Sequence, residues 1–304
     1  MAGQKIALID QKKQKVLSFY NQIAIKRDFW LKKNGYYYDY LTKLFSFYVE
    51  PDSSVLLVRS DTGYLLNSLK PCLGLGIDYS EDLVRLAKQN YPSLDFVCQD
   101  LENLTIKQKF DYIVLFNLLD DIPDAQSVFT ELHKVSTPRT RIILSNVNSL
   151  WHPLLKIGEK IHLKMPQMVL NWLSLPDIEN LLVLSGFEVI KENHALLFPK
   201  YIPILSWFLN RIVAKIPGIN RLCMIQILVA KPIAQAGNES NFSCSVVVPC
   251  KNEEGNIENA VRRIPEMGKG TEIIFVDDKS TDDTRNEILK WKEKFPNKNI
   301  KLVD

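Results

Sequence analysis

Residues 54–78, SVLLVRSDTGYLLNSLKPCLGLGID, decide the fold of the first part of the chain. SVLLV predicts a buried strand, GYLLNSL a helix and LGLGID a second strand, so the stretch has the pattern strand, tight loop, helix, strand. This pattern is typical of a parallel sheet covered by helices. Open sheets of this kind bind ligands outside the carboxyl ends of their strands, so residues 59–63 are the first candidate site.

The same alternation extends in both directions from this stretch. Before it, residues 19–49 predict two helices broken at Asn34-Gly35. After it, strands are expected at 94–100, 110–116, 140–146, 187–194 and 222–230, and helices at 80–90, 124–135 and 175–186. The fold class is therefore α/β, a Rossmann-like seven-stranded sheet with helices on both faces.

Composition limits the class of protein. The 304 residues are 46% hydrophobic and 24% charged, which is typical of a folded chain of about two domains. The net charge of +3 indicates no nucleic-acid partner. Five cysteines without CxxC spacing, and the lack of any apolar run of membrane-spanning length, favour a cytoplasmic protein.

Three polar residues follow expected strands and indicate a nucleoside site. Asp78 ends LGLGID, 21 residues beyond Leu57, where a carboxylate can accept hydrogen bonds from two ribose hydroxyls. Asp100 ends LDFVCQD, where it can meet an adenine edge, and Asn117 follows FDYIVLF. Because carboxyl ends of parallel strands share one edge, these side chains are expected to converge.

With these residues, positions 16–231 resemble a class I S-adenosylmethionine-dependent methyltransferase. The matching pieces are the DTG loop, GLGIDYSEDLVRLAK, QDLENL, FDYIVLFNLLDDIPD and VFTELHKVSTPRTRIILSN, with LCMIQILVA as a last, antiparallel strand. The resemblance implies S-adenosylmethionine as cofactor. It implies these cofactor-binding residues: Tyr20, Arg59, Asp61, Gly63, Asp78, Tyr79, Asp100, Leu101 and Asn117.

The first loop departs from the pattern V-L-D-x-G-x-G-x-G that is usual in that family. Leu57 stands at the acidic position, and Arg59 and Asp61 at the first two glycines, so that only Gly63 remains. Two alternatives follow. In one, Arg59 points outward while Asp61 meets the methionyl ammonium. In the other, these side chains fill the pocket and the domain is a structural or regulatory relic.

No catalytic residue is predicted, because methyl transfer from a sulfonium mainly requires an acceptor held in line. The four histidines are too dispersed to indicate a metal site. Residues 149–174 and the aromatic N-terminal helices can either form a lid over the acceptor or pack as core. Tyr20 is expected to border the cofactor, as the similar segment does in such methyltransferases.

Residues 201–222, YIPILSWFLNRIVAKIPGINRL, combine an apolar face with Arg211, Lys215 and Arg221. Such a segment either packs on its own domain or lies on a membrane surface. The second alternative predicts peripheral membrane contact through this segment, at the inner face of the membrane.

Residues 232–242 read as a polar linker, after which a second unit begins. CSVVVPCKNEEGNIENAVRRI and GTEIIFVDDKSTDDT, residues 244–264 and 270–284, resemble the start of a family 2 glycosyltransferase with the GT-A fold, most closely a polyprenyl-phosphate sugar synthase. The resemblance implies these nucleotide-sugar-binding residues: Pro249, Lys251, Asn252, Glu253, Asp277, Asp278 and Ser280. The later acidic motif for a divalent metal and the donor diphosphate is absent, so this chain alone is not expected to transfer sugar.

The expected organisation is therefore N-terminal helices at 1–50, a methyltransferase-like domain at 51–231, the linker, and a partial GT-A domain at 243–304 of a longer bifunctional protein. The expected function is methyl transfer to a small-molecule, glycan or lipid-linked acceptor. The alternative is a catalytically silent scaffold, or a domain that docks the glycosyltransferase to a membrane.

Overall fold

The computed structural model describes residues 2–116, 118–168, 170–171, 173–233 and 242–303, although the side chains of residues 2–10 are left aside. The chain forms two compact units, Met1–Ile233 and Ala234–Asp304. The division falls inside the stretch that the sequence predicts as a linker. Each unit is described separately below.

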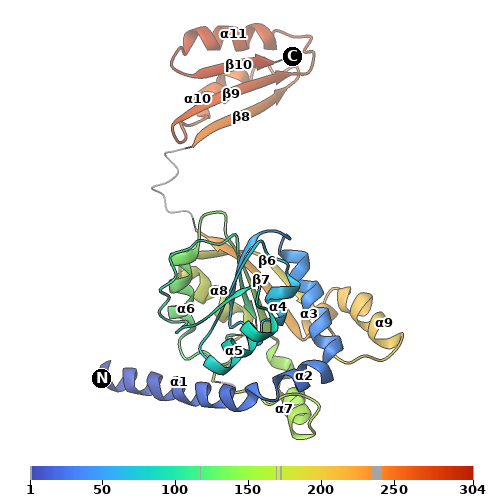
Figure 1. Cartoon of the computed structure of the whole chain (residues 1–304). Helices are drawn as coiled ribbons and strands as arrows, with labels where there is room; N and C mark the ends of the chain where they lie inside the picture. Colours follow the sequence, from blue (N-terminus) through green and yellow to red (C-terminus); the bar gives the residue numbers. More distant parts are fainter. Residues whose placement is uncertain (1, 117, 169, 172, 234–241, 304) are drawn as a thin grey trace. The chain divides into compact units, whose positions relative to one another are not determined.

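The first unit begins with helices α1 (Ala2–Ala24), α2 (Arg27–Lys33) and α3 (Gly35–Tyr48), after which strands and helices alternate (Figure 1). The further helices are α4 (Tyr64–Ser68), α5 (Glu81–Asn90), α6 (Ala125–Leu132), α7 (His152–Lys160), α8 (Leu175–Leu184) and α9 (Leu205–Arg211). Short 3-10 turns are η1 (His133–Val135), η2 (Ser149–Trp151), η3 (Val213–Lys215) and η4 (Ile219–Leu222). The strands are β1 (Ser54–Val58), β2 (Leu73–Asp78), β3 (Asp95–Cys98), β4 (Tyr112–Phe116), β5 (Arg141–Val147), β6 (Phe187–Ala195) and β7 (Ile225–Pro232).

These strands form one seven-stranded sheet in the order β3-β2-β1-β4-β5-β7-β6. The first five run parallel, with Val58 opposite Ile77 of β2 and Val55 opposite Tyr112 of β4. β7 runs antiparallel to both β5 and β6. The predicted α/β fold with a seven-stranded sheet and an antiparallel last strand is confirmed.

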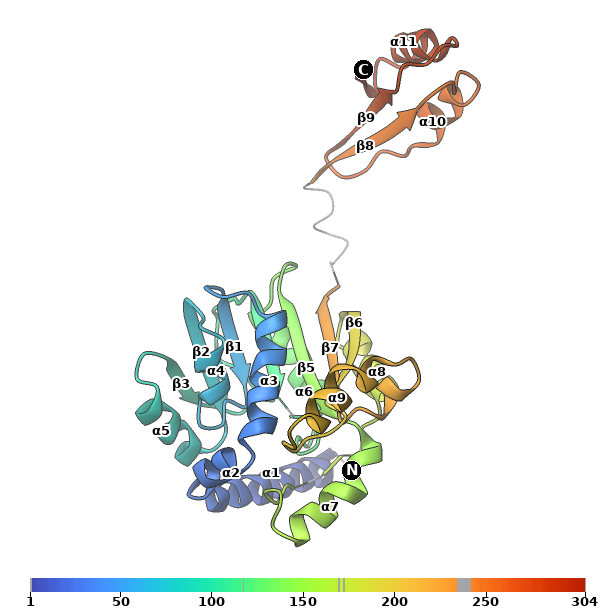
Figure 2. The same cartoon turned by 90° about the vertical axis from the view of Figure 1, so that its right-hand side faces the viewer.

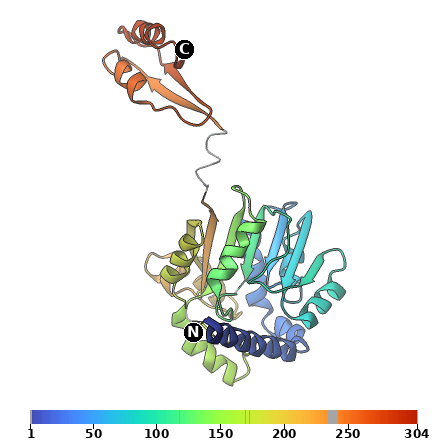
Figure 3. The same ribbon diagram turned by 90° about the vertical axis from the view of Figure 1, so that its left-hand side faces the viewer.

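Helices cover both faces of the sheet, because the strand side chains are apolar on both faces (Figures 2 and 3). On one face, Leu41 and Phe45 of α3, together with α4 and α5, pack on Val55 and Leu57 of β1. On the other face, α6 and α8 pack on Leu56 and Val58. The odd and even residues of β1 thus enter different cores, as the two-residue period of a strand requires.

The expected boundaries hold best for the strands. β1 and β2 match the predicted ranges, whereas β3 is limited to Asp95–Cys98. The predicted helix break at Asn34 is confirmed, but the chain also breaks between α1 and α2, which the sequence analysis did not predict. α1 begins far before residue 19 and buries Val16, Tyr20 and Ala24 on one face at a spacing of four residues.

The second unit contains strands β8 (Ser243–Cys250), β9 (Gly270–Asp277) and β10 (Asn299–Val303), with helices α10 (Ile257–Arg263) and α11 (Thr284–Lys294). The strands form a parallel sheet in the order β10-β9-β8. A small core that includes Ile273, Phe275, Ile288 and Trp291 joins this sheet to its helices. This arrangement fits the nucleotide-binding start of a GT-A domain.

Residues 201–222 form α9 and the turns η3 and η4. Ser206, Asn210 and Ala214 are buried, but large apolar side chains, among them Ile204 and Trp207, remain exposed. Within the part of the chain that the structure describes, no helix is long and apolar enough to cross a membrane.

Candidate functional site

The loop after β1 has an unusual backbone. Arg59 and Asp61 have φ angles of 63° and 53°, in the left-handed region where family members carry glycine. Gly63 has φ 83° and precedes α4. A Cβ at Gly63 would lie 2.7 Å from the ring of Phe96 and 2.9 Å from that of Tyr91, so this glycine is required by packing within the domain. The loop therefore keeps the glycine-type conformation at two positions that bear side chains.

The Arg59 side chain points into the domain. Its guanidinium lies 2.5 Å from a carboxylate oxygen of Asp121 and 4.2 Å from the centre of the Tyr20 ring. The Tyr20 hydroxyl donates to the same Asp121 oxygen. The Arg59 side chain is only 13% exposed and that of Asp121 1%. The alternative in which Arg59 points outward is therefore wrong.

Asp61 forms a second buried ion pair, with Arg27 from the start of α2. Arg27 Nε donates to Asp61 Oδ2 over 2.5 Å, and a terminal nitrogen of the guanidinium binds the same oxygen. The other terminal nitrogen donates to the Tyr38 hydroxyl and to the sulfur of Met165. The other Asp61 oxygen accepts from the backbone N–H of Thr62. The carboxylate expected to meet a methionyl ammonium is thus already paired.

Asp78 supports the loop from the end of β2. One carboxylate oxygen accepts from the backbone N–H of Asp61 and the other from that of Ser80. The residue is 1% exposed, and burial raises the pKa of Asp78 to about 6 despite the nearby Arg59 charge. Asp78 therefore connects the cofactor loop to α5 through the backbone.

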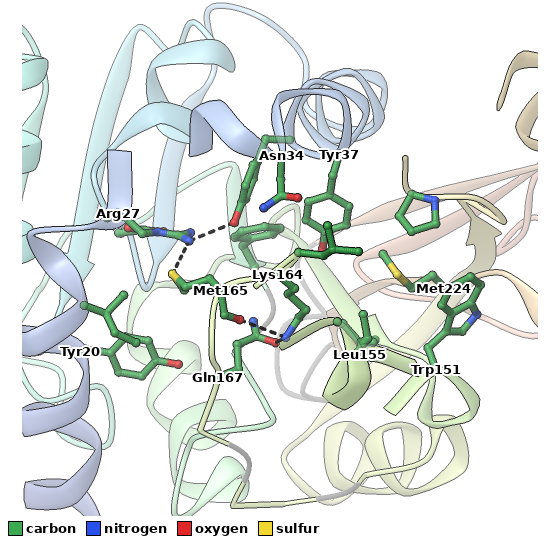
Figure 4. Close-up of a pocket in the computed structure, with 18 of the residues that line it drawn as sticks. Tyr20, Arg27, Asn34, Tyr37, Trp151, Leu155, Lys164, Met165, Gln167 and Met224 are labelled. Carbon is green, nitrogen blue, oxygen red and sulfur yellow. Dashed lines mark hydrogen bonds and ion pairs between the residues drawn. The ribbon is translucent and has the colours of Figure 1, made fainter. Parts of the chain in front are cut away.

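A first cavity of about 220 Å³ opens beside this loop (Figure 4). Its polar side holds Arg27, Asp61, Arg59 and Tyr20. Its remaining walls come from the N-terminal helices, from β4 and β5, from α7 with the chain after it, and from the stretches before α9 and β7. They include Asn34, Tyr37, Tyr38, Phe116, Val147, Trp151, Leu154, Leu155, Leu163, Lys164, Met165, Gln167, Lys200 and Met224. The aromatic helices and the 149–174 segment therefore share one cavity, as the lid interpretation predicts.

A second cavity, of about 320 Å³, lies at the carboxyl ends of β2, β3 and β4. It is lined by Tyr79, Cys98, Gln99, Asp100, Leu101, Glu102, Asp121, Ile122 and Pro123, and by Lys13, Gln14, Val16 and Leu17 of α1. Lys13 pairs with Asp100 at 2.8 Å and with Glu102 at 2.7 Å. Tyr79, Asp100 and Leu101, three of the residues expected to bind cofactor, thus line one cavity, whereas Asp78 does not.

Two buried polar atoms border the second cavity without a hydrogen-bond partner in the described part of the chain. They are the hydroxyl of Tyr79 and the Oδ1 atom of Asp121. Unpaired buried polar atoms are costly, so they mark places where a ligand can supply the missing partner. The donor and acceptor groups of a nucleoside fit this lining.

The Arg59–Asp121–Tyr20 cluster lies between the cavities, because Arg59 and Tyr20 line the first and Asp121 lines the second. Gly63 and Asp78, both expected to bind cofactor, line neither cavity. Asn117, expected to complete the site, lies outside the described residues.

Sequence reasoning did not identify three residues of this site, Arg27, Asp121 and Lys164. Asp121 lies five residues after the end of β4, within the stretch FDYIVLFNLLDDIPD, so its position beyond a strand end was a usable signal. Arg27 and Lys164 carry no comparable local signal, because each reaches the site from a helix or loop far away in the sequence.

In the second unit, the loops after β8 and β9 meet. The hydroxyl of Ser280 donates to Asp277 over 2.5 Å and accepts from the backbone N–H of Asn252 over 2.9 Å. The Lys251 ammonium lies 3.2 Å from a carboxylate oxygen of Asp278. The residues predicted to bind the nucleotide sugar, which also include Pro249 and Glu253, lie at one edge of this sheet. Across the described residues, no group of three or more His, Cys, Asp or Glu side chains is placed to hold a metal ion.

Comparison with known families agrees with both sequence resemblances. Residues 61–198 match the family model described as "Methyltransferase domain", and residues 245–304 match "Glycosyl transferase family 2". Protein 235L of Invertebrate iridescent virus 6, whose name marks it as a candidate methyltransferase, is 26% identical over 134 residues, covering 44% of this chain and 43% of that protein. Ubiquinone biosynthesis O-methyltransferases of Coxiella burnetii strains are 33% identical over 78 residues, covering 24% of this chain and 33% of theirs. The chain thus spans less than half the length of these curated relatives.

Solved structures extend the likeness to 71% of the chain. A candidate methyltransferase of Haloferax volcanii, solved in complex with the Trm112 methyltransferase activator, has a TM-score of 0.53 at 16% identity and covers 71% of this chain and 98% of its own. A SAM-dependent methyltransferase of Thermotoga maritima gives the same score and identity, covering 71% and 99%. At these identities the likeness confirms the fold.

Proposed function

We propose that this chain, which joins a methyltransferase domain to a family 2 glycosyltransferase segment, transfers a methyl group from S-adenosylmethionine in its first unit. The observation that carries the proposal is the pair of cavities at the carboxyl ends of the parallel strands, joined by the Arg59–Asp121–Tyr20 cluster. A cofactor with a nucleoside at one end and an amino acid at the other matches two adjoining cavities, one lined by Arg27 and Asp61 and the other by Tyr79 and Asp100.

The second cavity suits the nucleoside end. Tyr79 and Asp100 offer a hydroxyl and a carboxylate, and Leu101 offers an apolar wall. Carboxylates accept from ribose O–H and adenine N–H groups. Asp78 and Gly63 are proposed to act indirectly, since they hold the backbone of the loop rather than line a cavity.

The first cavity suits the methionyl end through Arg27 and Asp61. An α-amino acid carries an ammonium and a carboxylate, so a buried arginine–aspartate pair can exchange its mutual contact for one contact with each group. Asp61 then binds the ammonium, as the sequence suggests, and Arg27 binds the carboxylate. Arg59 and Tyr20 contact the cofactor where it passes between the cavities.

Once S-adenosylmethionine is bound, its sulfonium supplies a methyl group that a nucleophile can attack in line. The task of the protein is then to orient the acceptor and exclude water. The part of the first cavity away from Asp61, enclosed by Trp151, Leu155 and Met224, is the proposed acceptor site. In this site the 149–174 segment acts as the lid.

Calorimetric titration with S-adenosylmethionine tests the cofactor site. The wild-type chain is expected to bind, and Asp100→Ala to bind about tenfold more weakly, the equivalent of ~1.4 kcal/mol, because a nucleoside contact is lost. Asp100 is half exposed, so this variant keeps its fold. Asp95→Ala, an exposed carboxylate at the start of β3, is the matched control and should leave affinity unchanged. Absence of binding to the folded wild type at millimolar cofactor would contradict the proposal.

A second candidate function, docking to a membrane surface, is favoured by one observation. Ile204, Trp207 and Phe208 of the 201–222 segment are 84%, 58% and 46% exposed, beside the basic Arg211 and Lys215. Exposed apolar side chains flanked by cations are typical of segments that lie on anionic bilayers. We propose that this segment makes peripheral contact with such a membrane.

Vesicle flotation tests this second function. The chain is expected to float with phosphatidylserine vesicles and to lose that association in Trp207→Ser. Leu184→Ser, at an apolar residue of α8 that is 72% exposed, should float like the wild type. Equal flotation of both variants, or no flotation of the wild type, would show that residues 201–222 do not make the proposed membrane contact.

For the second unit we propose binding of the nucleotide part of a nucleotide sugar. The loops that carry Lys251, Asn252, Asp277 and Asp278 lie together at the carboxyl ends of β8 and β9. Nuclear magnetic resonance with uridine and guanosine diphosphates should shift amide signals of these loops. Shifts confined to other residues would refute the assignment.

A further inference from the structure

The first cavity is graded in polarity. Arg27, which pairs with Asp61, and Tyr20 lie at one end, and Lys164 and Gln167 occupy the middle (Figure 4). The other end is bounded by Trp151, Leu155 and Met224. If the polar end holds the methionyl group, an acceptor fills the apolar end.

Two neighbouring lysines beside the first cavity have no carboxylate partner in the described part of the chain. Lys200, which lines the cavity, donates to Asn34 Oδ1 over 2.7 Å and to the Leu163 carbonyl over 3.3 Å. Lys33 donates to the carbonyl of His162. These oxygens are neutral, and the Lys33 ammonium also lies 5.6 Å from the centre of the Phe29 ring and 5.1 Å from that of the Trp30 ring. Burial and the neighbouring Lys33 charge lower the pKa of Lys200, as expected where two ammonium groups lack an anion.

The other lysine that lines the cavity differs. The Lys164 ammonium lies 2.9 Å from Glu159 Oε1 and 2.7 Å from Gln167 Oε1, so its charge is already matched. The excess positive charge is therefore at Lys200 and the neighbouring Lys33, and not at Lys164.

The cavity lining beside Lys200, where the Leu163 carbonyl accepts from this lysine, is also apolar. Leu154 and Leu163 line the cavity and are nevertheless 58% and 45% exposed. The exposed apolar side chains continue at the spacing of one helix face with Leu150 just before α7, Ile157 within it and Ile161 just after it. An apolar chain can therefore pass from the cavity onto this face without meeting a polar wall.

We infer that the acceptor taken by the first cavity is an acidic amphiphile, with an apolar body against Trp151, Leu155 and Met224 and a phosphate or carboxylate group at Lys200 and Lys33. This inference rests on the proposed function, because it names the acceptor of that reaction. Charge complementarity selects the anion, and the apolar walls select the body. A lipid headgroup and a free small-molecule phosphate share this chemistry, so the test must separate them.

The test measures binding of four probes to the full chain without cofactor, each below its aggregation concentration: n-decyl phosphate, 1-decanol, decyltrimethylammonium and inorganic phosphate. The affinities are measured by calorimetry or by tryptophan fluorescence, since Trp151 lies in the wall of the first cavity. Decyl phosphate is expected to bind about tenfold more tightly than decanol, since an ion pair adds to burial of the same chain. Inorganic phosphate and the cationic probe should bind negligibly.

Variants locate the binding. Lys200→Gln should bring decyl phosphate down to the affinity of decanol, whereas Lys160→Gln, an exposed lysine at the end of α7, should leave it unchanged. Trp151→Ala should weaken both probes alike. Tight binding of inorganic phosphate alone would make this an anion site for a free phosphate and overturn the amphiphile. Equal binding of the anionic and cationic probes, or no response to Lys200→Gln, would also overturn the inference.

The two proposals fail separately. If S-adenosylmethionine binds but decyl phosphate does not, the acceptor class is wrong and the methyltransferase proposal stands. If decyl phosphate binds but S-adenosylmethionine does not, the cavity is a lipid site of another function.

Discussion

At the scale of single residues, the loop after β1 shows how a cofactor-type turn accommodates side chains where glycine is usual. Left-handed backbone at Arg59 and Asp61 costs roughly 1 kcal/mol each. Each side chain then forms a buried ion pair, with Asp121 and Arg27 respectively. Removing one partner of such a pair leaves an uncompensated buried charge. The effects on stability of substituting the two members of one pair, Arg59 and Asp121 or Arg27 and Asp61, are therefore expected to be coupled.

Gly63 allows a residue-scale prediction. Gly63→Ala should lower the free energy of unfolding by about 1 to 3 kcal/mol, because the new methyl meets Phe96 and Tyr91 at φ 83°. Gly35→Ala is the control, since nothing lies within 4 Å of its Cβ position at the start of α3. Urea unfolding measures both variants, and equal stability of the two would show that the Phe96 contact does not constrain this position.

Asp120 allows a prediction about pH. Burial raises its pKa to about 6, although Arg59 and Lys164 oppose the shift. Between about pH 4 and 6 the native state then binds more protons than the unfolded state, so this carboxyl contributes stability below pH 4 that is lost as pH rises through 6. Asp78 and Asp121, whose pKa values are also raised to about 6, add to the same trend.

Asp120→Asn should therefore be more stable than the wild type at pH 8, by on the order of 1 to 2 kcal/mol, and lose this advantage at pH 4. Hydrogen exchange of the β4 amides reports the first unit alone. Exposed Asp39→Asn should follow the wild type at both pH values. A pH-independent difference for Asp120→Asn would disprove the assigned shift.

At the scale of elements, Ser80 joins two helices. Its hydroxyl accepts from the backbone N–H of Leu83 at the start of α5 and donates to Asn21 Oδ1 of α1 over 2.6 Å. Ser80→Ala should weaken α5 and its contact with α1 by about 1 to 2 kcal/mol, seen as faster exchange of α5 amides. Ser149→Ala, at an exposed serine, is the control. Unchanged exchange in Ser80→Ala would mean that the cap contributes nothing here.

Helices and strands could be predicted where the sequence pattern that specifies them lies within the element itself. SVLLV and LGLGID are short apolar runs between turn residues, and both strands have the predicted bounds. The Ser80 cap is likewise a local feature. The length of α1 was missed, although Val16, Tyr20 and Ala24 repeat every four residues, because lysines and glutamines surround them.

The site was only partly predictable, for a different reason. Tyr79, Asp100 and Leu101 follow strand ends, and topology alone brings them together. The Arg59 side chain points inward because it contacts Asp121 and Tyr20, and the Asp61 carboxylate is paired because Arg27 reaches it. These partners come from distant segments, so no local pattern reports the ion pairs.

At the scale of the whole molecule, every residue that lines either cavity lies between positions 13 and 224. A chain ending at residue 233 should therefore bind S-adenosylmethionine with an affinity within about twofold of the full chain, measured by calorimetry. A marked loss of affinity in the folded shorter chain would show that the second unit contributes to the site.

The antiparallel β7 also determines how the first unit responds to tension. β7 is hydrogen-bonded on both sides, to β5 and β6, and leads into the linker, whereas β8 on the other side of the linker pairs with β9 alone among the described residues. A force applied through the linker must shear two ladders to extract β7 but only one to detach β8. For the part of the chain described, we therefore expect the second unit to yield first under load, while the two cavities of the first unit stay intact.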